Sequence, residues 1–270
     1  MTLIAFAKAR NIPEALRRDA GASSAARLVH LAAAAFIAWS LAPPLAAADE
    51  GPVVVLDVGH SLKRPGATSA RGVPEFAFNQ ALAAPVADAL REQGYAPRLI
   101  GVDGDVTDLR GRTSGARGAL FFLSIHHDSV QPRYLDTWMV DGVKRSYSDR
   151  FSGFSLFVSR ANPNLEQSLD CAVAIGERLR GAGFRPSLHH AEPIPGENRS
   201  LADAANGVYF FDDLVVLKTA AMPAVLFEAG IIVNRRDEVR LQENKARHAI
   251  ARAIAQGLAA CLGSAPPVNR

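Results

Sequence analysis

The chain has 270 residues and a formal net charge of +3, and its positive excess comes from one end. Residues 1–48 hold five of the 30 Lys and Arg residues and two of the 27 Asp and Glu residues, which leaves 25 of each elsewhere. A remainder with no net charge and no clustered positive patch excludes nucleic acid as an expected partner. With only two cysteines, Cys171 and Cys261, the chain is not a scaffold built on disulfides.

Residues 1–48 have the pattern of a secretory signal. Basic residues precede an apolar stretch at 31–42, and the alanines at 46–48 match a small-residue cleavage site. The stretch is about a dozen residues long, whereas a membrane span needs about 20. We therefore expect removal of residues 1–48, export to the periplasm or the cell exterior, and no stable membrane span in the domain 49–270. An uncleaved anchor and a mis-assigned start are the alternatives.

Strand-like and helix-like runs alternate along the first half of this domain. Unbroken apolar runs indicate strands, and apolar residues at helical spacing indicate helices. The elements expected there are strand 53–57, helix 75–93, strand 96–100, helix 106–118 and strand 120–125. Pro85 should kink or divide the first of these helices, because proline removes a backbone donor.

Beyond residue 129 the pattern loosens. The elements expected there are strands 137–140 and 154–159, helix 165–180, a long polar loop at 188–207, strand 224–227 and helix 236–262. Residues 215–218 are ambiguous. About 220 residues with this alternation predict a single layered α/β/α domain, in which helices flank a mostly parallel, twisted sheet. Both cysteines fall in predicted helices, where a disulfide and two buried free thiols are both open.

Three polar residues stand where predicted strands end, and a fourth begins a helix. His60 follows VVVLDVG, His126 follows LFFLSI and Glu228 follows MPAVLF, whereas Glu75 opens the helix after the first strand. The carboxyl ends of parallel strands meet at one edge of a sheet, where such folds bind ligands. Two imidazoles and one carboxylate can hold zinc and leave the fourth position for water. The sequence therefore predicts a hydrolytic zinc site with ligands His60, Glu75 and His126.

The remaining acidic residues near this site have different expected roles. Glu228 is the expected proton acceptor, because burial at the end of an apolar strand would raise its pKa. Asp57 either orients an imidazole ligand through a hydrogen bond or caps local backbone amides. Taken singly, each His or Glu has an ordinary explanation as a core or solvated residue. Their joint placement at strand ends favours a site.

These segments resemble the zinc-dependent N-acetylmuramoyl-L-alanine amidases of the Amidase_3 type, over about residues 53–262. The resemblance implies that VVVLDVGH supplies the ligand His60, that Glu75 is the second ligand, and that the SIH run supplies the third, His126. It also implies that MPAVLFEAGIIVN supplies the catalytic carboxylate, Glu228. The implied enzyme is a peptidoglycan hydrolase in which zinc-activated water cleaves the amide between N-acetylmuramic acid and the L-alanine of the stem peptide.

Other residues match or depart from the family pattern. Arg112 stands where the family usually has an arginine before its SIH strand, and a structural and a substrate-facing role are both open. The family typically has two glycines after its GH pair, whereas Ser61 to Arg64 intervene here, which affects the expected loop shape but not the ligands. His127 stands where the family usually has a small residue. It is expected to be a solvated surface imidazole, with a contact at the rim of the site as the alternative.

The segment from Tyr134 to Phe211 diverges most from the family. Its loop at 189–199 concentrates polar groups, and long polar loops are often functional. Some family members block their zinc with a glutamate from an inserted element. We therefore expect Glu192 or Glu197 to gate the site, or the loop to contact the stem peptide, with a solvated loop of no special task as the alternative.

Three function classes follow from the sequence. The amidase is expected first, with peptidoglycan as partner and any protein activator unknown. A zinc carboxypeptidase or endopeptidase acting on the same stem peptides is the second, because the metal chemistry hardly distinguishes one amide from another. A non-catalytic wall-binding module is the third, but such a module need not retain Glu228 beside three ligands.

Overall fold

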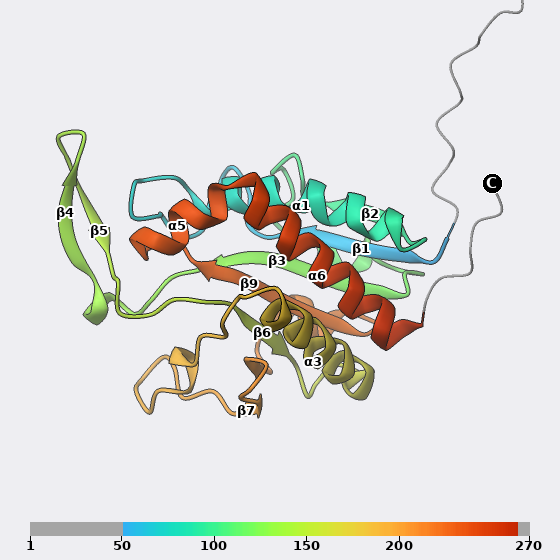
Figure 1. Ribbon diagram of the computed structural model, residues 1–270. Coiled ribbons are helices and arrows are strands. Elements are labelled where there is room, and N and C mark those ends of the chain that lie inside the picture. Colours follow the sequence, from blue (N-terminus) through green and yellow to red (C-terminus); the bar gives the residue numbers. More distant parts are fainter. Residues whose placement is uncertain (1–50, 264–270) are drawn as a thin grey trace, which may run out of the picture. The chain divides into compact units, whose positions relative to one another are not determined.

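The structure is a computed structural model that describes residues 51–263. Its centre is a seven-stranded sheet in the order β2-β1-β3-β9-β6-β8-β7 (Figure 1). The strands are β1 (Val53–Val58), β2 (Ala96–Ile100), β3 (Phe121–Asp128), β6 (Ser155–Val158), β7 (Leu201–Asp203), β8 (Val208–Phe210) and β9 (Ala224–Ile231). Neighbours from β2 to β9 run parallel, and β6 pairs antiparallel with β9. The expected mostly parallel sheet is confirmed.

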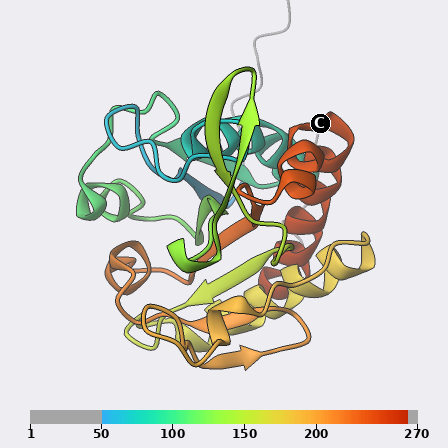
Figure 2. The same cartoon turned by 90° about the vertical axis from the view of Figure 1, so that its left-hand side faces the viewer.

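Helices cover both faces of this sheet (Figure 2). They are α1 (Glu75–Glu92), α2 (Leu109–Ser114), α3 (Leu165–Gly181), α4 (Val215–Thr219), α5 (Arg235–Gln242) and α6 (Asn244–Leu262). The larger core lies between the sheet and α1, α3 and α6, and a smaller core lies on the side of α2 and α4. The expected layered α/β/α domain is therefore confirmed.

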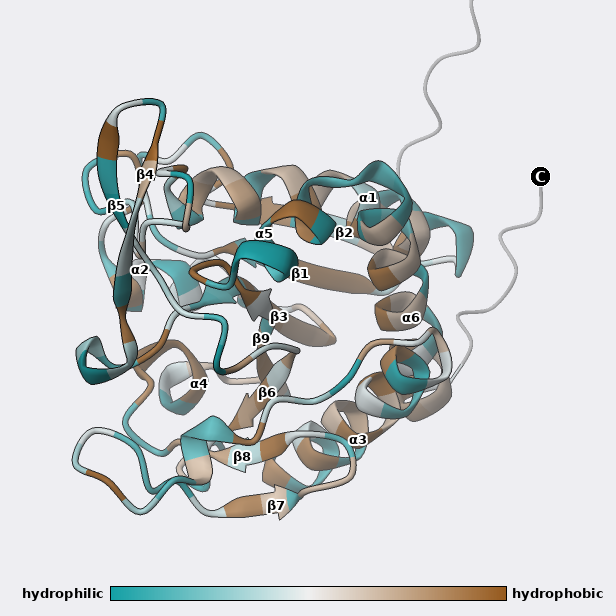
Figure 3. Ribbon diagram, turned by 60° about the vertical axis from the view of Figure 1, so that its left-hand side comes forward, coloured by the Kyte–Doolittle hydropathy of each residue, from teal (hydrophilic) through white to brown (hydrophobic). Residues whose placement is uncertain are grey.

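Alternating residues of each central strand enter the two different cores. In β3, Phe121 and Leu123 belong to the larger core, whereas Phe122 between them belongs to the smaller one. Successive side chains of a strand point to opposite faces, so a strand covered on both sides must be apolar throughout. This explains the unbroken apolar runs in the sequence, and Figure 3 shows the apolar residues gathered on the central strands. Full burial of each large apolar side chain contributes about 1.5–3 kcal/mol.

Two expected helix boundaries are wrong. Of the two effects expected of Pro85, the structure rules out division, because α1 is continuous from Glu75 to Glu92. The carbonyl that Pro85 leaves without a donor belongs to Ala81, whose residue is exposed, so water can bind it. The long helix expected at 236–262 is two helices, because Glu243 between them has extended backbone.

The buried carboxylate of Glu238 holds α5 against the loop before α1. Glu238 is fully buried and accepts hydrogen bonds from Ser69 Oγ at 2.7 Å and from the Arg71 backbone N–H at 2.9 Å. These contacts tie α5 to the loop before α1. The α5 helix begins at Asn234, whose side chain accepts from the N–H groups of Arg236 and Asp237.

Irregular parts of the chain gather at the carboxyl ends of β1, β3 and β9. A separate hairpin of β4 (Asp136–Val140) and β5 (Val143–Tyr147) projects beyond that edge (Figure 1). The predicted polar loop at 188–207 contains a 3₁₀ helix, His189–Ala191, and the short strand β7. The ambiguous residues 215–218 lie in α4, and β9 continues three residues past Glu228.

The predicted secretory signal and the boundary after residue 48 lie outside the described residues 51–263 and stay predictions. Within the described part of the chain, none of the helices has the length and apolar character that crossing a bilayer demands.

A disulfide between Cys171 and Cys261 joins α3 to the end of α6, with the α-carbons 5.1 Å apart. The two cysteines are separated by 90 positions in sequence. A cross-link over so long a loop restricts the unfolded chain. The structure thus selects the disulfide from the two states that the sequence left open.

Replacing both cysteines with serine should lower the free energy of unfolding by about 2–4 kcal/mol, because the unfolded chain regains the loop entropy. Urea denaturation followed by far-UV circular dichroism measures this. Wild-type protein kept in reductant is the matched control and should lose as much. Identical denaturation midpoints for oxidised wild type and the double variant would contradict the stabilising role.

Candidate metal centre

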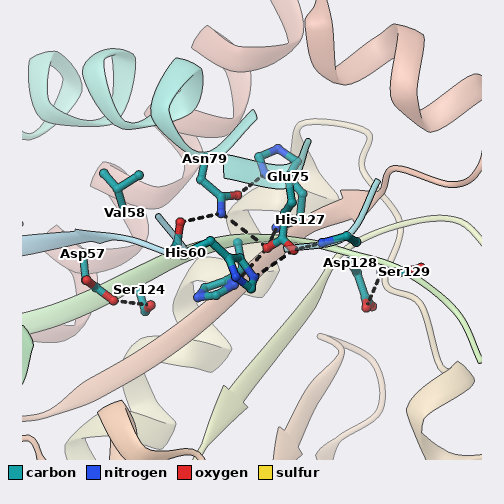
Figure 4. Close-up of polar contacts among 12 residues, drawn as sticks. Asp57, Val58, His60, Glu75, Asn79, Ser124, His127, Asp128 and Ser129 are labelled. Carbon is teal, nitrogen blue, oxygen red and sulfur yellow. Dashed lines mark hydrogen bonds and ion pairs between the residues drawn. The ribbon is translucent and has the colours of Figure 1, made fainter. Parts of the chain in front are cut away.

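His60, Glu75 and His126 meet at the carboxyl end of the sheet. Figure 4 shows His60 and Glu75 close to each other there. Glu75 Oε2 lies 2.9 Å from His60 Nε2, and Glu75 Oε1 lies 3.0 Å from His126 Nδ1. One ligand atom from each of the three residues lies within 4.8 Å of the others. The arrangement therefore has the two nitrogens and one oxygen that a divalent cation requires, on three different elements.

Two glycines make room for this approach. A side chain at Gly59 would overlap the His126 ring, and one at Gly66 would overlap the Glu75 carboxylate. The rings of His60 and His126 thereby come to 4.9 Å between centroids. His60 itself has a φ of 67°, a left-handed conformation that costs a non-glycine residue about 1–3 kcal/mol. Such strain persists only where the surrounding contacts hold the residue in place.

Arg112 makes contacts that hold the backbone at His60 in place. It is 2% exposed and donates hydrogen bonds to the backbone carbonyls of Val58, at 2.6 Å, and of His60. Its guanidinium also pairs with Asp57 Oδ1 at 2.6 Å. Asp57 in turn accepts from Ser124 Oγ at 2.7 Å. Arg112 is thus a buried residue that fixes the backbone on which His60 stands.

Asp57 takes neither of the two roles that the sequence left open, because its partners are the side chains of Arg112 and Ser124. Figure 4 shows its carboxylate turned toward Ser124 and away from the ligands. Asp57 lies in β1, three residues before His60. Its side chain is buried and forms the ion pair with Arg112. Asp57 and Arg112 were each singled out in the sequence, but the ion pair between them was not predicted.

A second buried network holds Glu75. Its Oε1 accepts from the backbone N–H of His127 at 3.2 Å and from Asn79 Nδ2 at 3.3 Å. Its Oε2 accepts from the N–H of Ala67 at 3.0 Å. Asn79 Nδ2 also donates to the carbonyl of Gly59 at 3.1 Å. Asn79, one turn along α1 from Glu75, therefore connects the second ligand to the loop that carries the first.

The prediction that His127 is a solvated surface residue is wrong. His127 is 2% exposed and its Nδ1 donates to Asn79 Oδ1 at 2.7 Å. Adjacent residues of a strand point to opposite faces, so His127 enters the interior beneath α1 while His126 faces the site. Burial lowers the pKa of His127 to about 3, and the ring is neutral. Asn79 is not among the site residues predicted from the sequence, and the burial of His127 was not predicted either. The alternation of side chains along a strand was a signal for that burial.

The charge on Glu75 suits a cation. Burial alone would raise the pKa of Glu75, but the hydrogen bonds and charges of His126 and His60 outweigh it and hold that pKa below its usual range. The 4% exposed side chain is therefore a carboxylate between two imidazoles. A buried anion with nitrogen donors on both sides is the chemistry of a divalent metal site.

Glu228 lies beside this cluster on β9. It pairs with His126 in the β3 and β9 register. Its Oε2 atom is enclosed and has no hydrogen-bond partner. Burial, followed by the charges of Asp128 and Glu75, raises the pKa of Glu228 well above its usual value. A buried carboxyl group with a raised pKa beside a candidate metal site is a candidate for proton transfer.

Two cavities flank the cluster. One of about 310 Å³ is lined by His60 and Arg112 together with apolar residues that include Leu109 and Val215. The other, of about 270 Å³, is lined by Glu228 and by residues of the loop 189–199. His126 lines both, so the metal centre stands between two spaces at the sheet edge that faces the viewer in Figure 2.

The two candidate gate residues have partners outside the metal cluster. Glu197 pairs with His190 Nδ1 at 2.8 Å and accepts from Gln131 Nε2 at 2.8 Å. Glu192 lies 3.9 Å from an Arg150 guanidinium nitrogen. Their expected role as a gate, or as a contact for the stem peptide, stays a prediction.

Replacing Asn79 with alanine should weaken zinc binding by about 10- to 100-fold, because Glu75 loses a partner that orients it. Competition against a chromogenic chelator measures the affinity. Glu92→Gln, at the exposed end of the same helix, is the control and should bind zinc like wild type. An unchanged affinity in a folded Asn79→Ala protein would contradict the orienting role.

Comparison with known proteins gives the family. A family model described as N-acetylmuramoyl-L-alanine amidase, Amidase_3, matches residues 54–260. The solved catalytic domain of CwlV from Bacillus (Paenibacillus) polymyxa var. colistinus is 24% identical, with a TM-score of 0.59 over 79% of this chain and 99% of that chain. Ami1 from Mycobacterium smegmatis is 22% identical, with a TM-score of 0.62 over 79% and 98% of the two chains.

An amidase from Clostridium difficile 630 is 19% identical, with a TM-score of 0.61 over 79% of this chain and 98% of that chain. A comparison with curated proteins gives no match. The structural likenesses agree with the observed α/β/α fold, and the family model spans most of the sequence. The chain therefore belongs to the N-acetylmuramoyl-L-alanine amidase family.

Proposed function

We propose that this amidase binds zinc through His60, Glu75 and His126 and uses it to cleave the amide between N-acetylmuramic acid and L-alanine in peptidoglycan. The observation that carries the proposal is the convergence of these three donors within 4.8 Å, with Glu75 held as a carboxylate. Two His and one Glu are a known ligand set of hydrolytic zinc enzymes, and the set leaves one position open. Family membership supports the reaction.

We assign Glu228 the proton transfers of the reaction. When bound, zinc supplies Lewis-acid activation of water and of the amide carbonyl. Glu228 accepts the proton that the attacking water loses and delivers it to the departing alanine nitrogen. Its place opposite His126 and its raised pKa support this role. Arg112 and Asn79 are positioning residues, which hold His60 and Glu75 in place.

We further propose that the protein acts outside the cytoplasm. The signal-like pattern at 1–48 and a peptidoglycan substrate support export. The disulfide between Cys171 and Cys261 supports an oxidising compartment. The CwlD amidase from Clostridioides difficile was solved in complex with the GerS lipoprotein. A protein activator of this chain stays a prediction.

Glu228→Gln should lower kcat on purified peptidoglycan by about 10²- to 10⁴-fold, because the amide side chain cannot accept the proton. Zinc content should be unchanged, since Glu228 is not one of the proposed ligands. Glu243→Gln, an exposed residue between α5 and α6, is the matched control. A Glu228→Gln protein that hydrolyses peptidoglycan at the wild-type rate would contradict the assignment.

Removing the metal should abolish the activity and zinc should restore it. Protein dialysed against a chelator is assayed on peptidoglycan, and zinc is then added back in measured steps. Mass spectrometry of the products identifies the bond, and release of stem peptides with a free L-alanine amine is expected. Cleavage between peptide residues, with the bond from muramic acid to alanine intact, would identify an endopeptidase or carboxypeptidase instead.

A further inference from the structure

A second group of side chains that could bind a metal lies at the end of β3, the strand that carries His126. His190 Nε2 is 2.8 Å from Asp128 Oδ2, and His189 Nε2 is 3.4 Å from the same oxygen. One ligand atom from each of the three residues lies within 4.8 Å of the others. Asp128 ends β3, whereas the two histidines form the 3₁₀ helix of the loop 189–199. The cluster therefore joins this loop to the sheet.

The opposite nitrogen of each imidazole is already fixed. His189 Nδ1 bonds Ser187 Oγ at 2.9 Å, and His190 Nδ1 pairs with Glu197 Oε2 at 2.8 Å. Glu197 is itself held by Gln131 Nε2 at 2.8 Å. Histidines that bind metals characteristically give their second nitrogen to such a partner, which sets the ring orientation and leaves Nε2 for the ion. Both rings of this cluster have that arrangement.

One nitrogen of the cluster has no partner. His189 is 3% exposed, and its buried Nε2 makes no hydrogen bond, because Asp128 Oδ2 is near it but not in bonding geometry. The two rings lie 3.8 Å apart between centroids, and the Nε2 atoms of both approach the same oxygen, Asp128 Oδ2. A buried polar atom left unpaired costs about 1–3 kcal/mol. A cation bound by the three residues would satisfy it.

We propose that Asp128, His189 and His190 form a second metal site, for Zn²⁺ or a similar divalent transition metal. Its donors, two imidazole nitrogens and one carboxylate oxygen, suit zinc better than the oxygen-preferring Mg²⁺ and Ca²⁺. The site opens on the cavity that His126 and Glu228 also line. An ion there ties the loop 189–199 to β3 at the wall of the catalytic cavity. This site does not depend on the catalytic assignments above.

Zinc stoichiometry tests the proposal without an activity assay. Chelator-stripped protein is titrated with Zn²⁺ by calorimetry, and bound zinc is counted by elemental analysis. Wild type should bind about two ions per chain, and His60→Ala/His126→Ala should keep one of them, because the second site shares no ligand with the first. Asp128→Asn/His190→Ala should also bind about one ion. His248→Ala, an exposed histidine on α6, is the matched control and should keep both.

Cobalt gives an independent readout, since its visible absorption reports nitrogen ligands. The His60→Ala/His126→Ala protein loaded with Co²⁺ should show this absorption and lose it when His190 is also replaced. Binding of a single ion by wild type, and of none by His60→Ala/His126→Ala with native circular dichroism, would overturn the proposal. The cluster would then be only a charged bridge, in which His190 joins the carboxylates of Asp128 and Glu197. If the double variants do not fold, the single variants His60→Ala and His190→Ala replace them, and each should bind one ion fewer than wild type.

Discussion

The carboxylate of Glu75 is the group on which the site depends. It is almost fully enclosed, and both its oxygens are shared between an imidazole and backbone N–H groups. A buried charge of this kind is tolerated only with such partners, since an isolated carboxylate in the interior would be neutralised. Its partners come from the loop after β1, the loop before α1 and the end of β3. A shift of any of these segments would leave the buried charge of Glu75 without one of its partners.

Stability and function are therefore linked at the same residues. Arg112 and Asp57 form a buried ion pair. The guanidinium of Arg112 also donates hydrogen bonds to the backbone carbonyls of Val58 and His60. Breaking a buried pair by removing one partner commonly costs about 3–5 kcal/mol, because the other charge remains without compensation. The strained backbone of His60 is held by this pair from one side and by Asn79, through Gly59, from the other. These contacts hold the proposed ligands in place before any metal binds, and positions held in this way favour chemistry at a fixed geometry.

The loop 189–199 forms part of the wall of the cavity that His126 and Glu228 also line. It is fastened through His190, whose pKa rises to about 9 because Asp128 and Glu197 together outweigh the effect of burial. Burial lowers the pKa of the neighbouring His189. The pKa values of the two adjacent histidines therefore shift in opposite directions, because only His190 lies between two carboxylates. His190 thus connects the loop to Asp128 at the end of β3, in the cavity that Glu228 also lines.

The sequence by itself determined the layered fold and the residues that meet at the metal centre. Unbroken apolar strands require cover on both faces, and parallel strands bring their carboxyl ends together, so His60, His126 and Glu228 had to share one edge. Only the tertiary structure decided the pairing of Asp57 with Arg112, the burial of His127 beneath α1, and the union of Cys171 with Cys261. These contacts join segments far apart in sequence, and their geometry depends on how helices pack against the sheet, which local periodicity does not encode.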